Sequence, residues 1–254
     1  MEIDPRSRFS HRAEHYAKYR PGYPAEIVPF LSREIGLAAE TVIADIGSGT
    51  GLLSRLWLAN GNNVYGVEPN LEMRAKAESQ LGEYAKFRSV AGCAENTMLP
   101  PGSIGMVSAG QAFHWFDPVK ARTAFERILK AGSFVIMAWN TRKEEASPFA
   151  KAYQEILREH GTNRVSGHHR SQREERLAEF FGPEGYRLAT FDNAQVLDFE
   201  ATRGILLSMS SSPLPGEPGY EPIMARLKRA FDECQKDGCV RFEYTTQLFY
   251  GKLS

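Results

Sequence analysis

The hydrophobic positions of this chain follow two patterns that alternate along its first 140 residues. Short continuous apolar runs, bounded by glycine or polar residues, are typical of buried parallel strands. Between these runs, apolar residues recur three and four positions apart, as on a helix that buries one face. The predicted strands cover 42–44, 63–68, 86–91, 104–109 and 132–139. The predicted helices cover 24–36, 52–60, 70–82 and 118–129.

The pattern changes after residue 140, where the regular alternation of strand and helix ends. Residues 242–250 alternate at period two, as in an antiparallel strand that closes a sheet. The other predicted elements are helices beginning at 147, 171, 202 and 220, and a strand within 186–199. We therefore expect a Rossmann-like doubly wound α/β sheet of seven strands with a late antiparallel strand and a helical cap.

Three parts are expected along the chain. Residues 1–38 form an N-terminal lid segment and helix, 39–140 form the core, and 141–254 hold the cap inserts and the closing strands. Within the last part, 162–173 is polar and is expected to be a loop. Its adjacent histidines, His168 and His169, have no further ligand at metal-binding spacing, so we expect no metal site.

Composition narrows the class of protein. The chain has 254 residues, of which 42% are hydrophobic, and its 31 Lys and Arg balance its 31 Asp and Glu. A balanced charge argues against nucleic acid as a partner, and no apolar run is long enough to predict a membrane span. Three cysteines fit neither a disulfide framework nor a zinc site, which favours a reducing, cytoplasmic compartment. We expect a monomer or a homodimer.

The most informative stretch joins the first predicted strand to the next helix. It has an acidic residue, Asp45, two positions before three alternating glycines, Gly47, Gly49 and Gly51. Glycines let the chain turn tightly and let a ligand lie against the backbone, at the N-terminus of a helix. A dinucleotide fingerprint would have a small residue where Leu52 stands, and a carboxylate beside the turn suits a cationic group better than a pyrophosphate.

Residues Asp45 to Gly51 resemble the first motif of class I S-adenosylmethionine-dependent methyltransferases, of the type 11 kind, and the resemblance continues through about 40–140. In that family the glycine loop, here Gly47, Ser48, Gly49 and Gly51, passes under the methionine part of the cofactor. The resemblance implies that Asp45 lies near the amino group of that part.

Further cofactor contacts are expected at the ends of the next two strands. Glu68 ends the second strand, where a carboxylate can accept hydrogen bonds from both ribose hydroxyls. Pro69 follows it, and Met73 on the next helix either contacts adenine or packs in the core. In the family, a small residue and an acidic residue after the third strand hold adenine, and Ala94 and Glu95 match that pair.

The segment from Gln111 to Phe116 follows the fourth strand, at the edge where doubly wound sheets bind ligands. It resembles a subgroup that includes the trans-aconitate methyltransferases, in which this loop lies beside the transferable methyl. Gln111 is therefore expected at the cofactor. His114 is either a general base or a residue that positions the loop, and we favour positioning because methylation of a carboxylate needs no base. Trp115 is a candidate wall for cofactor or acceptor.

The acceptor candidates come from two distant segments. Tyr19 and Arg20 precede a proline-rich turn and belong either to a lid over the cofactor or to a solvated surface. Trp139 and Arg142 end or follow the fifth strand. The subgroup resemblance implies a small carboxylate acceptor, and an arginine would bind a carboxylate through two hydrogen bonds.

The sequence therefore predicts an enzyme that transfers a methyl group from S-adenosylmethionine to a small molecule. A nucleoside-binding module without turnover is the main alternative. A nicotinamide-dependent oxidoreductase is disfavoured by Leu52 and Asp45.

Overall fold

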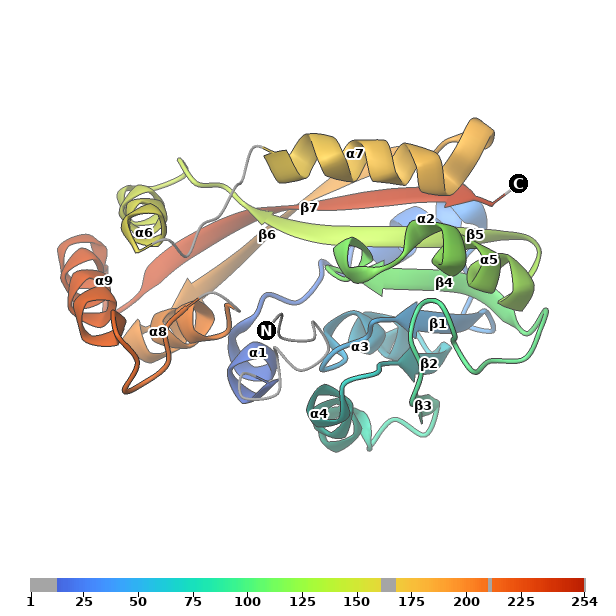
Figure 1. Cartoon of the computed structure of the whole chain (residues 1–254), viewed down its shortest axis with the longest axis horizontal. Coiled ribbons are helices and arrows are strands. Elements are labelled where there is room, and N and C mark those ends of the chain that lie inside the picture. The colour runs from blue at the N-terminus through green and yellow to red at the C-terminus, as the bar shows by residue number, and fades with distance from the viewer. Residues whose placement is uncertain (1–12, 161–167, 210–211, 254) are drawn as a thin grey trace.

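A computed structural model describes residues 13–160, 168–209 and 212–253 of the chain (Figure 1). Within these residues, one sheet of seven strands has the order β3-β2-β1-β4-β5-β7-β6. Strand β7 is antiparallel to both of its neighbours, and the first five strands are parallel to one another. The strands are β1 (Val42–Ile46), β2 (Asn63–Val67), β3 (Phe87–Val90), β4 (Ile104–Gly110), β5 (Leu129–Arg142), β6 (Arg187–Leu197) and β7 (Val240–Lys252). The predicted fold class is confirmed.

The helices agree with the prediction except at the N-terminus and in the middle of the chain. They are α1 (Ala13–Tyr19), α2 (Ile27–Ile35), α3 (Leu52–Ala59), α4 (Leu71–Leu81), α5 (Pro118–Ile128), α6 (Pro148–Glu159), α7 (His168–Phe181), α8 (Phe199–Leu207) and α9 (Tyr220–Cys234), with 3-10 turns η2 (Phe113–Trp115) and η3 (Gly182–Glu184). Helix α1 was not predicted. Helix α7 begins at His168. This start lies inside the segment expected to be a polar loop and three residues before the helix start expected at 171. In the described part of the chain, no helix is long and apolar enough to span a membrane.

Alternating side chains of the sheet pack into two separate hydrophobic layers. On β5, Val135 and Met137 face α5 and α7, whereas Ile136 and Ala138 face α2 and α3. The period of two along a strand sends successive side chains to opposite faces, so a strand covered on both sides is apolar throughout. This explains the continuous apolar run from which the fifth strand was predicted.

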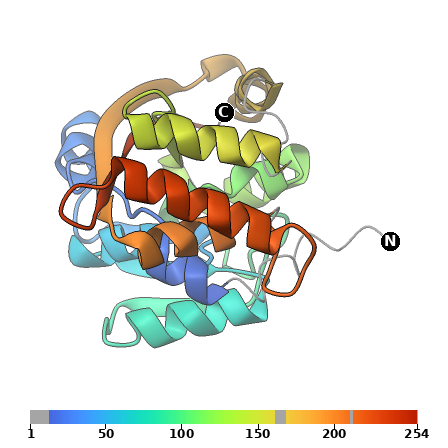
Figure 2. The ribbon, with the colours of Figure 1, turned by 90° about the vertical axis from the view of Figure 1, so that its left-hand side faces the viewer.

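The cap is built on the long ends of the last three strands. Strands β5, β6 and β7 continue beyond the parallel part of the sheet and carry α6, α8 and α9 at their far end (Figures 1 and 2). These helices share a core of their own, to which Phe149, Leu227 and Phe242 contribute. Tyr19 of α1 belongs to the same core, and Figure 2 shows α1 beside α8. Helix α7 instead packs with α5 on the sheet through Phe180. The segment between β5 and β6 therefore contributes α6 to the cap and α7 to the core.

Candidate active site

A cavity of about 900 Å³ lies at the carboxyl ends of β1, β2 and β4, between the core and α1. Several predicted site residues line it: Arg20, Gly47, Gly49, Glu68, Pro69, Met73, Ala94, Glu95, Gln111, His114 and Trp115. A smaller cavity of about 40 Å³ shares part of this wall and is lined in addition by Asp45 and Ser48. The structure thus brings together most of the residues that the sequence proposed for a cofactor.

The three alternating glycines have positive φ angles and three different surroundings. A Cβ on Gly47 would lie 2.7 Å from that of Ala112, so this glycine lets the loop after β4 approach. A Cβ on Gly49 would meet no atom within 4 Å, and this glycine lines the cavity. A Cβ on Gly51 would collide with Leu81. Gly51 therefore packs α3 against α4 and, unlike the other two, does not line the cavity as predicted.

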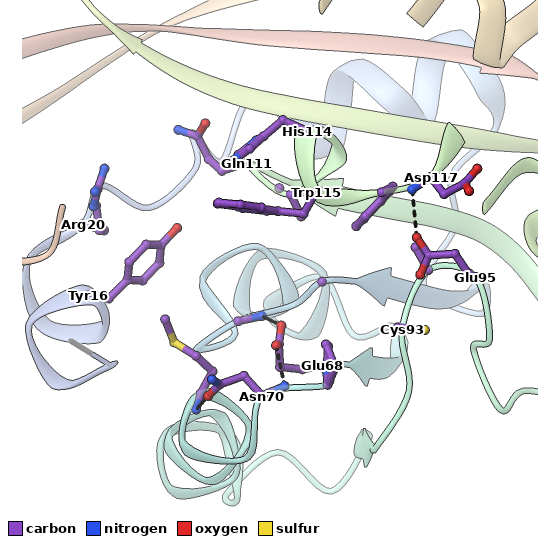
Figure 3. A pocket seen from close by; sticks show the side chains of 18 of the residues that line it. Tyr16, Arg20, Glu68, Asn70, Cys93, Glu95, Gln111, His114, Trp115 and Asp117 are labelled. Carbon is purple, nitrogen blue, oxygen red and sulfur yellow. Dashed lines mark hydrogen bonds between the residues drawn. The ribbon is translucent and has the colours of Figure 1, made fainter. Parts of the chain in front are cut away.

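Glu68 connects the glycine loop to the end of β2. Its Oε2 accepts from the backbone N–H of Gly49 and its Oε1 from that of Asn70, each at 2.9 Å (Figure 3). The side chain is only 8% exposed, and burial raises its pKa while the two N–H groups lower it. A carboxylate oxygen has more than one acceptor position, so these bonds leave capacity for ligand hydroxyls. Asn70, the N-cap of α4, also lines the cavity and was not predicted as a site residue.

Asp45 is completely buried at the end of β1. The hydroxyls of Ser54 and Ser108 donate to its two oxygens at 2.6 and 3.0 Å. Burial raises the pKa of this carboxyl to about 6, and the serine hydrogen bonds oppose that rise. Thr50, which is also buried beside the smaller cavity, has no partner for its Oγ1 among the described residues. This small cavity is thus bordered by a buried carboxyl group and by a buried hydroxyl group.

The segment after β3 closes the main cavity at the end next to the start of α5. Glu95 Oε1 accepts from the backbone N–H of Asp117 at 2.8 Å, which ties this segment to the start of α5 (Figure 3). The predicted contact of Glu95 with adenine remains a prediction. Cys93, Asp117 and Lys120 also line the cavity and were not proposed as site residues from the sequence. Cys93 adjoins the predicted Ala94, and Asp117 is the N-cap of α5, where its side chain accepts from the backbone N–H of Lys120.

The loop after β4 buries some of its side chains in the core and exposes two others toward the cavity. Phe113 and Phe116 are buried, whereas His114 and Trp115 are exposed and their ring centroids lie 4.7 Å apart. Gln111 adopts a positive φ of 58° and its Nε2 donates to the carbonyl of Asn140 at 3.1 Å. The two buried aromatic side chains therefore anchor the loop that presents the polar and aromatic groups in Figure 3.

Tyr16 of α1 and Arg20, which directly follows this helix, cover the cavity, whereas Tyr19 does not (Figure 3). The Tyr19 ring is buried in the cap, and its hydroxyl donates to Glu200 at 2.8 Å. Arg20 Nε donates to the Ser208 hydroxyl at 2.8 Å, and its guanidinium lies 5.1 Å from the centroid of the Tyr16 ring. Tyr16 and Arg20 are four residues apart and so share one helix face, a spacing from which this pair could have been found.

Two predicted acceptor residues lie elsewhere. Trp139 is 6% exposed and packs in the core, with the Arg173 guanidinium 5.0 Å from its ring centroid. The Arg142 guanidinium lies 4.5 Å from the ring centroid of Tyr153 and 5.1 Å from that of Phe242. Neither residue lines the cavity, because β5 continues past the core and carries Arg142 into the cap. Of the two arginines predicted as partners of a carboxylate acceptor, Arg20 lines the cavity and Arg142 does not.

Known proteins resemble both the sequence and the fold. Residues 44–137 match the family model described as a methyltransferase domain. An uncharacterised methyltransferase of Mycobacterium tuberculosis strain H37Rv is 34% identical over 129 residues, which are 51% of this chain and 50% of that protein. The chain spans about half the length of the curated mycobacterial relatives that it matches.

Two solved structures share the fold. A type II methyltransferase from Anaeromyxobacter dehalogenans has a TM-score of 0.65 and 20% identity, over 92% of this chain and 98% of that one. A methyltransferase from Thiobacillus denitrificans, in complex with S-adenosyl-L-homocysteine, has a TM-score of 0.52 and 14% identity, over 98% of this chain and 99% of that one.

The sheet order and the cavity at its carboxyl edge define a doubly wound α/β fold with a cavity where such folds bind ligands. The family match over residues 44–137, which include the glycine motif, agrees with the class I S-adenosylmethionine-dependent methyltransferase family expected from that motif. The narrower likeness to the trans-aconitate methyltransferases stays a prediction.

Proposed function

We propose that this chain transfers a methyl group from S-adenosylmethionine to a small-molecule acceptor. The observation that carries the proposal is the position of Glu68, a nearly buried carboxylate on the cavity wall, fixed by the backbone of Gly49 and Asn70. A carboxylate held at the end of the second strand suits the two hydroxyls of a ribose. The bound S-adenosyl-L-homocysteine of the Thiobacillus protein supports the same class of ligand.

The residues beside the glycine loop fit the rest of that cofactor. Gly49 leaves open space where any side chain would project, so a ligand can lie against its backbone. Asp45 offers a buried carboxylate to a cationic amino group, and Thr50 offers a buried hydroxyl that has no partner in the described structure. The smaller cavity therefore has the chemistry required by the amino-acid end of S-adenosylmethionine.

When bound, the cofactor supplies a methyl group on a positively charged sulfur. The protein's part is to bind, to orient and to keep water away, because such a transfer depends on alignment of the reacting atoms. Trp115, Tyr16 and Met209 supply aromatic and thioether surface around the part of the cavity beyond the glycine loop. We infer that His114 positions this loop. A pH profile of the His114→Asn variant would show whether it acts as a base instead.

The described residues that line the cavity carry charges of both signs. Glu68, Glu95 and Asp117 lie on the side of β2 and α5, together with Lys120 of α5, and Arg20, which directly follows α1, lies across from them (Figure 3). A small carboxylate is the proposed acceptor class, with Arg20 as its cationic partner. Arg142 has no part in this proposal, since it lies in the cap.

Calorimetry with S-adenosyl-L-homocysteine tests the cofactor, and NADH serves as the control dinucleotide. Binding of the first and not the second is expected. A metabolite extract incubated with the protein and isotopically labelled cofactor then identifies the methylated product by mass spectrometry. Binding without any labelled product would favour the nucleoside-binding module, and tight NADH binding would overturn the proposal. The cytoplasmic location, the oligomeric state and the absence of a nucleic-acid partner stay predictions.

A further inference from the structure

Asp45 sits at the meeting point of three elements. On the sheet, it is paired in register with Ser108 of the neighbouring strand β4. Above the sheet, the first turn of α3 brings Ser54 to the same carboxylate. Both hydroxyls belong to fully buried side chains, and each donates to a different oxygen of Asp45. The carboxylate is thus held from the strand side and from the helix side, which fixes the plane of the group.

Trp57 fixes the direction of one of these hydrogen bonds. It lies three residues after Ser54 on the same helix, is fully buried, and its Nε1 donates to Ser108 Oγ at 3.0 Å. An indole N–H is a donor only, so the Ser108 oxygen must accept from it. The hydroxyl hydrogen of Ser108 is then left for Asp45. A chain of donors therefore runs from Trp57 through Ser108 to Asp45 and requires an acceptor at its end.

The groups around Asp45 set its electrostatic surroundings. Glu68 acts on it from the end of β2, and the buried Tyr23 lies close enough to feel its charge. Arg20 and Tyr16 of α1 line the same small cavity. Of these, only Arg20 carries a positive charge, and its Nε donates to Ser208. Most of the stabilisation of an ionised Asp45 in the ligand-free protein therefore comes from its hydrogen bonds.

We propose that Trp57, Ser108 and Ser54 form a positioning network that presents Asp45 as an oriented carboxylate to the cationic amino group of the bound cofactor. The inference rests on the proposed function for the identity of that ligand. None of the three residues lines the main cavity, and they act through Asp45. A carboxylate buried without hydrogen-bond donors would take up a proton and lose its attraction for a cation. The donors of this network favour the ionised form of Asp45.

The Ser108→Ala variant tests the network through a pH profile. Removal of this donor raises the pKa of Asp45 further, so a larger fraction of the ligand-free protein holds a neutral acid near pH 6. Hydrogen bonds to charged groups are strong enough that we expect the affinity for S-adenosyl-L-homocysteine to fall about tenfold at pH 6. The difference should vanish by about pH 8.5, where Asp45 is ionised in both proteins. Calorimetry over this range measures it.

Three further variants separate positioning from mere structure. Ser108→Thr restores the hydroxyl and should recover the wild-type profile. Trp57→Phe keeps the ring and removes the N–H, so it should move the profile in the same direction by less. Ser89→Ala removes a hydroxyl that donates to Glu78 on the surface and should change nothing. A loss of affinity in Ser108→Ala that is equal at pH 6 and 8.5, or no loss at all, would overturn the proposal.

A measurement without ligand keeps the two proposals distinguishable. The side-chain carboxyl carbon of Asp45 can be titrated by NMR in the ligand-free protein, and its midpoint should rise in Ser108→Ala. An unchanged midpoint overturns the network whatever the ligand is. If the wild-type protein binds no S-adenosyl-L-homocysteine at any pH, the proposed function fails and the titration still decides on the network.

Discussion

The two ends of the cavity are built in different ways. The end proposed for the nucleoside, called the nucleoside end below, depends on backbone groups close in sequence, since Glu68 accepts from the N–H groups of Gly49 and Asn70. The end proposed for the acceptor, called the acceptor end, depends on side chains far apart in sequence, since Arg20, directly after α1, donates to Ser208, directly after α8. Backbone donors are present whatever the neighbouring side chains are, so the first end is stable to most substitutions around it. The second end exists only while α1 stays docked on the cap.

This comparison predicts that substitutions at the two ends affect different ligands. Changes in the glycine loop or at Glu68 should weaken the cofactor, and changes at the contact of α1 with α8 should weaken the acceptor. The contact is close: a Cβ on Gly204 of α8 would collide with the Tyr19 ring. Gln195 Nε2 also donates to the Tyr19 carbonyl at 3.0 Å. Helix α1 is therefore fixed to the cap, although Tyr16 on it lines the cavity.

The largest effect is expected from Gly49→Val. A branched side chain would project into the cavity from a residue with φ of 55°, which β-branched residues avoid. Binding of S-adenosyl-L-homocysteine should fall by more than about a hundredfold in calorimetry, because a ligand against the backbone loses its place. The exposed Gly22, where a Cβ meets nothing within 4 Å, supplies the control Gly22→Val. Unchanged affinity in a folded Gly49→Val protein would refute the cofactor assignment.

A smaller effect on the same end is expected from Glu68→Ala. The loss of two ligand hydrogen bonds to a charged group should weaken cofactor binding by about 1.5–3 kcal/mol. The KM of the acceptor should change little, since Glu68 lies on the opposite side of the cavity from Arg20 (Figure 3). Steady-state kinetics with each substrate varied in turn measures both values. An equal rise of both KM values would show that the two ends are not independent.

Gly204→Ala is expected to weaken binding of the acceptor more than binding of the cofactor. Even one methyl group has no room beside Tyr19, and overpacking of a buried contact costs about 1–3 kcal/mol of stability. Displacement of α1 should raise the KM of the acceptor more than the Kd of S-adenosyl-L-homocysteine. Gly22→Ala is the matched control. If the variant loses stability and both ligands bind as before, α1 does not shape the acceptor end.

The smallest effect is expected from Arg20→Lys. A lysine keeps the charge and loses the planar fork, so kcat/KM for a carboxylate acceptor should fall about tenfold if one charged hydrogen bond is lost. Arg142→Lys, in the cap, should leave kcat/KM unchanged and lower the stability alone. The pair of variants separates contact with the acceptor from support of the cap. An uncharged acceptor, or equal kcat/KM in Arg20→Lys, would remove the carboxylate from the proposal.

Local patterns predicted the sheet, its last antiparallel strand and the residues at the nucleoside end. Asp45, Gly49 and Glu68 were found from the sequence because a strand, a tight turn and a helix follow one another there without a break. Parallel strands place their carboxyl ends at one edge, so residues that end successive strands must meet. The sequence did not distinguish Gly51, which has no room for a Cβ beside Leu81, from Gly47 and Gly49, which line the cavity.

Only the tertiary structure decided the acceptor end. The sequence offered Tyr19, Arg20 and Arg142, and the structure turns Tyr19 and Arg142 into the cap while Arg20 faces the cavity together with Tyr16, which was not predicted. The face of α1 that meets the cavity is set by its docking on Gly204, which lies more than 180 residues away along the chain. The reach of β5 beyond the core likewise depends on its pairing with β7, which carries Arg142 away from the site. Contacts between such distant segments leave no periodic pattern in either one, so the local sequence placed the residues proposed for the cofactor, and packing placed those proposed for the acceptor.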